Sequence, residues 1–285
     1  MESWLRAFVE VAEQRRFGVA AERLSITQPA LTKQIQALER ELGAPLFDRG
    51  RHGATLTEFG RLLLPQARDL VAGTQEFTRR AHQLARGERG RLAVGFGMST
   101  MDLAPQAIAA FRQRYPEVEI GLEDLPSATQ LERLRTGELH VGFIRLPAGP
   151  GLNQLVLRHE RLALAHTGPA PDELPEWLGR QRLVRLARAA GPGLVAQVDR
   201  LCAAWGIAPG IAHETNHLHT VLALVAAGSG PALVPTSAAT VSPAGVELTP
   251  IADPAASWAV GVVWQADTRH AITVNFLALV RKLLG

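Results

Sequence analysis

Apolar side chains recur at helical spacing through the first part of the chain and predict three short helices. The first carries an i, i+3, i+4, i+7 stripe made of Leu5, Phe8, Val9 and Ala12. The segment FGVAAERLS then predicts a compact second helix, whose two adjacent alanines allow a neighbouring helix to approach closely. The third helix follows the turn SIT and contains the segment TQPALTKQIQALEREL.

The third predicted helix has one apolar and one polar side. On a helical wheel the apolar arc consists of Leu31, Ile35, Leu38 and Leu42, and the opposite side consists of Pro29, Thr32, Lys33, Gln36 and Arg40. Thr27 is a suitable N-cap, and a proline in the first turn needs no intrahelical donor. The N-terminal end therefore presents Gln28, Thr32 and Lys33, with Gln34 at the margin.

A hairpin and a long helix are predicted next. Two apolar strands, Pro45 to Phe47 and Ala54 to Leu56, flank a turn rich in Gly and Arg. Residues 57–88 predict one helix, with apolar positions that step by four and three residues: Leu63, Ala67, Leu70, Thr74, Phe77, Ala81 and Leu84. A heptad seam of this length predicts pairing with a copy of the same helix. The alternative is a single helix that lies on its own domain.

From residue 91 the pattern changes to alternating strands and helices. Strands are predicted in RLAVGFG, VEIGLED, HVGFIRL, RLALAH, LVRLA, IAHE, PALVP and WAVGVVW, and AITVNFLALVRKLL closes the chain as an amphipathic helix. This alternation predicts an α/β domain with largely parallel sheets. The expected domains are 1–58, the helix 59–88, and 89–285, the last divided into subdomains of about 91–160 with 266–285 and of about 161–265.

Composition and charge narrow the class of protein. The 285 residues are 47% hydrophobic and 20% charged, which is typical of globular domains. Residues 1–90 hold 14 Lys and Arg against 11 Asp and Glu, whereas the remainder holds 16 against 16, so the positive excess lies at the N-terminal end. The single cysteine, Cys202, excludes an internal disulfide. The N-terminal segment lacks the features of a signal peptide, and no apolar run is long enough to span a bilayer, which predicts a cytoplasmic protein.

The polar end of the third helix has the chemistry of DNA recognition. Amide side chains can bond adenine, lysine can reach guanine acceptors, and a threonine methyl can contact a thymine methyl. Two helices joined by a tight turn are typical of a helix-turn-helix, with the hairpin turn Arg49 to His52 as a wing on the phosphate backbone or minor groove. A solvated face of Gln, Lys and Arg is nevertheless common on surface helices, so the wheel alone leaves both interpretations open.

The segments AAERL, TQPALTKQIQALERELG, PLF and LTEFG closely resemble the winged helix-turn-helix of LysR-type transcriptional regulators. The resemblance covers essentially the whole chain. It implies that Gln28, Pro29, Thr32 and Lys33 form the base-contacting end of the recognition helix and that Arg49 and Arg51 belong to the wing. Thr27 and Gln34 complete the predicted DNA-binding residues. It also implies a dimer through the long helix, assembly into a homotetramer on promoter DNA, and an effector domain built like periplasmic binding proteins. RNA polymerase is a further candidate partner. One departure is Gly18, which stands where relatives usually have Ser or Thr.

Helix starts in the C-terminal half predict an anion site. Hydroxyl side chains at helix N-termini favour negative charge, so we expect a small carboxylate effector contacted by Ser99, Thr100 and Thr129, with Phe143 and His217 as further lining residues. The alternative is that these hydroxyls only cap helices. The segment DLPSATQLERLRTGELHVGFIRLP resembles the subgroup that controls degradation of aromatic compounds. The last of its three arginines, Arg145, is either a ligand contact or a structural residue.

The sequence offers little for catalysis. His213, His217 and His219 cluster without carboxylate or cysteine partners at ligand spacing, so no metal site and no cofactor are expected. GSGPALVP lacks the glycine spacing of a nucleophile elbow. An enzyme or a solute-binding protein that uses the α/β domain remains the alternative to a regulator.

Overall fold

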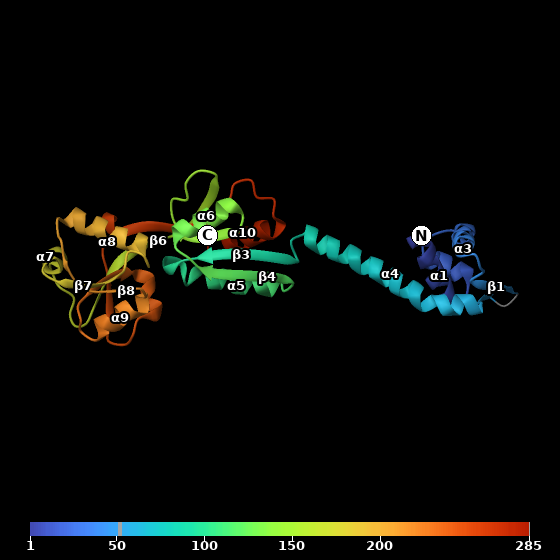
Figure 1. Ribbon diagram of the computed structural model, residues 1–285, viewed down its shortest axis with the longest axis horizontal. Helices are drawn as coiled ribbons and strands as arrows, with labels where there is room; N and C mark the ends of the chain where they lie inside the picture. Colours follow the sequence, from blue (N-terminus) through green and yellow to red (C-terminus); the bar gives the residue numbers. More distant parts are fainter. Residues whose placement is uncertain (51–52, 285) are drawn as a thin grey trace. The chain divides into compact units, whose positions relative to one another are not determined.

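The computed structural model describes residues 1–50 and 53–284, which form two compact units, Met1–Leu84 and Ala85–Gly285 (Figure 1). The first unit contains three short helices, a hairpin and a long helix. In chain order these are α1 (Glu2–Gln14), α2 (Phe17–Arg23), α3 (Gln28–Leu42), β1 (Phe47–Gly50), β2 (Gly53–Leu56) and α4 (Glu58–Ala85).

The core of the first unit is built from the predicted stripes, with two corrections. The buried side chains of α1 are Ala7, Phe8 and Val11, whereas Leu5 and Val9 are only partly buried. Leu31, Ile35 and Leu38 of α3 are buried as predicted. Leu42 is 40% exposed, because it is the last residue of α3 and the chain turns away at Gly43, where φ is +76°.

The hairpin starts later than predicted. Its first strand begins at Phe47 and not at Pro45, because Pro45 has no N–H for a strand ladder and its carbonyl accepts a hydrogen bond from the Thr57 hydroxyl at 2.8 Å. The Thr57 hydroxyl also accepts from the Gly60 amide at 2.9 Å, which confirms Thr57 as the cap of α4. The Ala54 amide donates to the Arg15 carbonyl at 2.9 Å and ties the hairpin to α1.

The apolar seam of α4 divides into two halves. Ala67 is buried in the core of the first unit, and Leu63 is partly buried against it. Further along, Leu70, Phe77 and Leu84 are 58%, 72% and 55% exposed. The first turns of α4 therefore lie on their own domain, as the alternative interpretation expected, and the later turns present an exposed apolar seam, for which pairing with a second copy stays a prediction.

The second unit alternates strands and helices as expected. Its elements are β3 (Gly90–Phe96), the 3-10 turn η1 (Met98–Thr100), α5 (Leu103–Arg114), β4 (Val118–Asp124), α6 (Ser127–Thr136), β5 (Val141–Arg145), β6 (Leu152–His166), α7 (Leu174–Gly179), β7 (Arg182–Leu186), α8 (Pro192–Trp205), β8 (Gly210–Thr215), α9 (Leu218–Ala226), β9 (Ala232–Pro235), η2 (Thr236–Val241), β10 (Glu247–Pro250), η3 (Pro254–Ala256), β11 (Ser257–Gln265) and α10 (Ala271–Leu284).

The prediction of largely parallel sheets is wrong for the main sheet. Its order is β10-β6-β11-β5-β3-β4, with β9 also on β6, and only the pairs of β3 with β4 and β5 are parallel. The strand β11 returns antiparallel between β5 and β6, and β6 continues antiparallel to β9 and β10. β7 and β8 form a separate parallel pair. The local sequence pattern does not show the direction in which β6 and β11 pair with their neighbours.

Two lobes share this framework. We call the first lobe β3, β4, β5, β11 and the start of β6 with α5, α6 and α10, and the second lobe the end of β6 with β7 to β10 and α7 to α9. The predicted boundary assigned β11 to the second subdomain, whereas Val260–Val263 pair with β5 in the first. β6 runs through both lobes.

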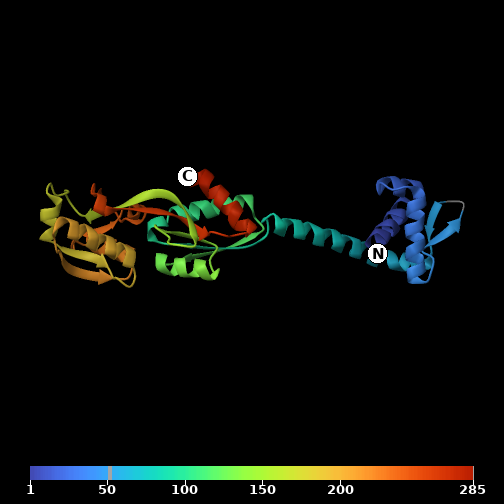
Figure 2. The same cartoon turned by 90° about the horizontal axis from the view of Figure 1, so that it is seen from above.

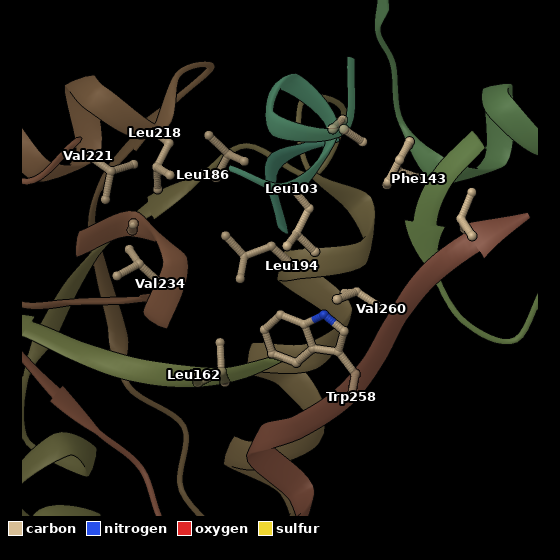
Figure 3. Packing of buried hydrophobic residues seen from close by; sticks show 14 of the residues in the cluster. Leu103, Phe143, Leu162, Leu186, Leu194, Leu218, Val221, Val234, Trp258 and Val260 are labelled. Carbon is tan, nitrogen blue, oxygen red and sulfur yellow. The ribbon is translucent and has the colours of Figure 1, made fainter. Parts of the chain in front are cut away.

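One apolar core extends through both lobes. In the first lobe, α5 and α10 cover one face of the sheet, and α6 covers the other, where Leu134 and Ile144 are buried (Figure 2). Figure 3 shows the larger cluster, in which side chains from both lobes are buried: Leu103, Phe143, Leu162, Trp258 and Val260 with Leu186, Leu194, Leu218, Val221 and Val234. Within the described residues no helix is long and apolar enough to cross a membrane.

Candidate functional site

The first candidate site is the N-terminal end of α3. The turn between α2 and α3 is tight: Ser25 adopts φ +55°, and the Ile26 amide donates to the Ala21 carbonyl at 3.0 Å. The Thr27 hydroxyl accepts from the Ala30 amide at 3.4 Å, so the predicted N-cap is present. Pro29 lies in the first turn as expected.

The polar side of α3 is open to solvent. Gln28, Pro29 and Lys33 are exposed, and Thr32 and Gln34 are half-buried. The Thr32 hydroxyl donates to the Gln28 carbonyl at 2.9 Å, which leaves its methyl group and oxygen lone pairs for other contacts. The structure therefore brings the residues predicted from α3 together at one helix end.

A hollow of about 560 Å³ runs beside this helix end. Its walls come from the start of α2, from one side of α3 and from the hairpin, and its lining residues are Arg16, Phe17, Gly18, Gln28, Thr32, Ile35, Gln36, Glu39, Phe47, Asp48 and Ala54. A methyl group placed on Gly18 would lie 3.7 Å from the Gln28 side-chain oxygen, so the two residues face each other. The N-cap of α2 is Arg16, whose side chain makes no capping hydrogen bond.

Glu39 is a positioning residue that the sequence did not reveal. Its Oε1 accepts hydrogen bonds from the Leu46 amide at 2.8 Å and the Phe47 amide at 3.3 Å. Glu39 therefore fixes the start of the hairpin against α3. A single carboxylate at the margin of an amphipathic helix gives no sequence signal for this role.

Several cations of the first unit have no acidic partner. Arg23 and Arg68 form ion pairs with Glu10 and Glu13. Within the described part of the chain, four basic residues near the helix-turn-helix take part in no ion pair. They are Arg15, Arg16, Lys33 and Arg40. Of the predicted wing residues, Arg49 lies in β1 opposite Ala54, and Arg51 lies outside the described residues.

In the second unit, two predicted effector residues are part of the core. Thr100 is 1% exposed, and its hydroxyl is bonded to the carbonyls of Gly97 at 2.9 Å and Phe143 at 3.3 Å. Phe143 is fully buried and packs edge-on against Phe276, with ring centroids 6.2 Å apart. Their expected contact with a ligand is corrected to a structural role, because neither side chain has a free face.

Ser99 and Thr129 are half-buried, and His217 is exposed as the N-cap of α9. Arg158 joins the Ser99 carbonyl, at 3.0 Å, to the carboxylates of Asp102 and Glu160. Glu160 is 2% exposed and also accepts a hydrogen bond from the Thr236 hydroxyl of the second lobe. This ionic cluster fixes η1 against the strand that both lobes share.

Arg145 is a further charged residue where the lobes meet. Its guanidinium lies 3.9 Å from the centroid of the Trp258 ring, and its Nη1 donates to Gln197 of α8 at 2.8 Å. Its backbone amide donates to the Ser127 hydroxyl at the start of α6 at 3.3 Å. No carboxylate of the described residues pairs with Arg145. Burial and then Arg200 lower the pKa of Arg145 to about 10, so the side chain is charged at neutral pH.

Two histidines of the predicted cluster lie next to each other at the start of α9. The rings of His217 and His219 stack with centroids 5.3 Å apart, and both side chains are exposed. Among the residues that the structure describes, no three metal-ligating side chains come together.

Comparison with known proteins gives the same division of the chain. Residues 3–61 match the family described as bacterial regulatory helix-turn-helix protein, lysR family, and residues 85–285 match the LysR substrate binding domain. The chain is 33% identical to the HTH-type transcriptional regulator TfdS of Cupriavidus pinatubonensis over 99% of this chain and 98% of the relative. It is 34% identical to the HTH-type transcriptional regulator IlvR of Caulobacter vibrioides over 96% and 95%.

Solved structures of similar proteins share the architecture. The crystal structure of CbnR, a LysR family transcriptional regulator, is 29% identical with a TM-score of 0.84, and covers 99% of this chain and 100% of that one. Full-length CbnR complexed with its target DNA gives 28% identity and a TM-score of 0.80, with 99% of each chain covered.

The role of Glu39 can be measured on the full chain. Glu39→Ala is expected to lower the free energy of unfolding of the first unit by about 1–3 kcal/mol, because the buried Leu46 amide loses its acceptor. Glu39→Gln retains an acceptor oxygen and should cost less. The measurement is urea unfolding followed by hydrogen exchange of peptides from residues 1–84. The exposed Glu41 of the same helix provides the control, and equal losses for Glu39→Ala and Glu41→Ala would show that the hairpin contact stabilises nothing.

Proposed function

Because the chain belongs to the LysR family of bacterial transcription regulators, which bind DNA and carry an effector-binding domain, we propose that it reads promoter DNA through the Gln28 to Lys33 end of α3. The observation that carries this proposal is the exposed polar end of a helix whose other side is buried. Members of this family are regulators and not enzymes, and the chain is a regulator as well.

Distinct roles follow from the positions of the polar groups. Gln28, Thr32 and Lys33 contact base edges, with Thr27, Pro29 and Gln34 beside them at the same helix end. Phosphate contacts come from the unpaired Arg16 and Arg40 and from the wing residues Arg49 and Arg51. Unpaired cations suit this role, because phosphates supply the negative charge that the protein itself does not.

Base reading by Lys33 can be separated from charge. Lys33→Ala is expected to cost about 1–3 kcal/mol on the cognate duplex and much less on a scrambled one. Arg40→Ala, which removes an exposed cation from the same helix, should weaken binding to both duplexes alike and reduce the salt slope by about 1. Fluorescence anisotropy on a selected promoter duplex and its scrambled control makes the comparison at several salt concentrations. Equal losses of Lys33→Ala on both duplexes would remove its base-reading role.

The exposed part of α4 supports a homodimer. Leu70, Phe77 and Leu84 repeat every seven residues and are more than half exposed, and a second copy of α4 would bury them. Two such dimers would form a tetramer on DNA in the cytoplasm, where RNA polymerase is a further partner. The similar CbnR binds its target DNA as a full-length protein, which is consistent with this assembly.

Phe77→Asp tests the seam. Each copy loses about 1.5–3 kcal/mol of phenylalanine burial and gains a charge at the interface, so the dimer should dissociate at micromolar concentration. Sedimentation equilibrium of the full chain measures this directly. Thr78→Asp introduces the same charge beside the seam and should leave the dimer intact. A dimer that survives Phe77→Asp would contradict pairing through α4.

We further propose that the effector is a small anion, such as a carboxylate, held between the lobes by Ser99, Thr129 and Arg145. Arg145 supports this because its guanidinium contacts a ring and an amide and forms no ion pair in the described part of the chain, although the charge of Glu160 reaches it. It also lies at the starts of α6 and α8, where unpaired amide groups favour an anion: its amide contacts Ser127, and a methyl on Gly193 would lie 3.6 Å from its Nε.

An effector can act only if it binds two arrangements of the protein with different affinity. Closure of the lobes around an anion would select one arrangement of the dimer and thereby change how the DNA-binding units meet the promoter. A ligand that bound both arrangements equally would leave transcription unchanged.

A thermal-shift screen of benzoate, succinate and related acids tests the proposed site. An acid that binds only the folded state raises the melting temperature. Ser99→Ala and Thr129→Val should each weaken the binding free energy of that acid by about 1.5–3 kcal/mol, which is the contribution of a hydrogen bond to a charged group. Calorimetry measures this change. Thr240→Val, on the exposed surface of η2, is the matched control. Unchanged affinity in both site variants would place the acid elsewhere.

A further inference from the structure

A stacked pair of histidines lies in the first lobe, away from the residues of the proposed effector site. His140 immediately precedes β5, and His270 immediately precedes α10. Their rings are 4.3 Å apart between centroids and inclined by only 17°. Both half-buried side chains line a hollow of about 540 Å³, together with Gly137, Leu139, Gln265, Asp267, Thr268 and Arg269.

Hydrogen bonds define the protonation of His140. The Ala93 amide of β3 donates to its Nδ1 at 2.9 Å. Only a ring nitrogen without a proton can accept, so His140 is neutral and carries its proton on Nε2. That tautomer leaves no lone pair on Nε2 for a metal, and the described residues contain no group of three metal-ligating side chains. The chemistry left to the pair is the uptake of protons.

His270 is held in a similar way. Its Nδ1 lies 2.9 Å from the hydroxyl of Thr273, which is fully buried in α10. The surroundings of the two rings make both histidines harder to protonate. Burial, then His270 and Arg91 of β3, lower the pKa of His140, and burial lowers the pKa of His270. Asp267 and Arg269 line the hollow from the loop before α10, and Glu138 is 3.7 Å from Arg133 in an ion pair.

We propose that the stacked rings of His140 and His270 form an acid-sensitive clasp that holds the N-terminal end of α10 against β3 and β5. Protonated His140 would direct an N–H at the N–H of Ala93, so the ring must leave that position. A second positive charge on the facing ring adds repulsion at short distance. Acid therefore opens the clasp, and neutral pH closes it.

The end of α10 that the clasp holds contacts the segment after α4. The Asn275 side chain donates to the carbonyls of Arg86 at 2.8 Å and Gly87 at 3.3 Å. A methyl group on Gly87 would lie 2.6 Å from the Ala271 backbone, so the two segments are in close contact. Opening of the clasp would loosen the first turn of α10 at the point where the chain enters the second unit.

The sign of the pH dependence follows from the lowered pKa values. The folded state binds fewer protons than the unfolded chain, in which histidine titrates near its usual pKa of about 6.5. The stabilisation by the clasp is complete above that pH and is lost as the pH falls toward the lower folded values. Variants without the two histidines should show a free energy of unfolding that changes less with pH over the same range.

Hydrogen exchange of the Ala93 amide tests the clasp in the full chain, with pepsin peptides that cover residues 91–96. After correction for the intrinsic pH dependence of exchange, protection in the unmodified chain should fall between pH 7.5 and 5.0, because protonation of His140 removes the acceptor of the Ala93 amide. In His140→Asn the amide oxygen takes the place of Nδ1 as acceptor and does not titrate, so protection should remain constant. His213→Asn, on an exposed side chain of β8, should behave as the unmodified chain.

Two results would overturn the proposal: constant protection in the unmodified chain, or an equal fall in His140→Asn. If His140→Asn does not fold, His270→Phe tests the proposal in its place. Phenylalanine keeps the stacked ring and removes one titrating group, so the fall in protection should move to higher pH. An unchanged midpoint in His270→Phe would exclude coupling between the two rings.

Discussion

Leu31, Ile35 and Leu38 of α3 are buried in the core of the first unit, and this burial sets the rotation of α3 about its own axis. Each side chain contributes about 1.5–3 kcal/mol of apolar burial, so a rotated helix would lose several kcal/mol. The polar side must then face solvent. Glu39, at the margin of the same helix, uses its carboxylate to hold the hairpin in place. Recognition helix and wing are thus fixed by one buried stripe and one acidic side chain.

Three groups of the chain lack the partner that their chemistry requires. In the described part of the chain, the cations beside the helix-turn-helix form no ion pair, the later turns of α4 have no apolar cover, and Arg145 forms no ion pair. We propose that these partners come from outside the chain, as phosphates, a second copy of α4 and an anionic effector. The proposed sites would then be linked, because an effector at Arg145 would act on a domain whose copies α4 joins.

The lobes of the second unit are connected through β6 and β11, which pair antiparallel over most of their length. Because the buried cluster is continuous through both lobes, relative movement must bend these strands or rearrange side chains at the seam. Arg158, Glu160 and Arg145 make polar contacts where the two lobes meet. The histidine clasp lies at the start of α10, where this helix contacts the segment after α4.

The sequence by itself determined the positions of α3, α4 and α10 and the polar end that α3 presents. The period of apolar residues located α3 and predicted α10 with the bounds 271–284 that the structure has, because helical spacing depends only on residues within one or two turns. Tertiary structure decided which way β11 returns, that Thr100 and Phe143 are core residues, and that Glu39 holds the hairpin. It also brought His140 to His270, 130 residues further along the chain. Contacts of this kind join distant segments, and no local period encodes them.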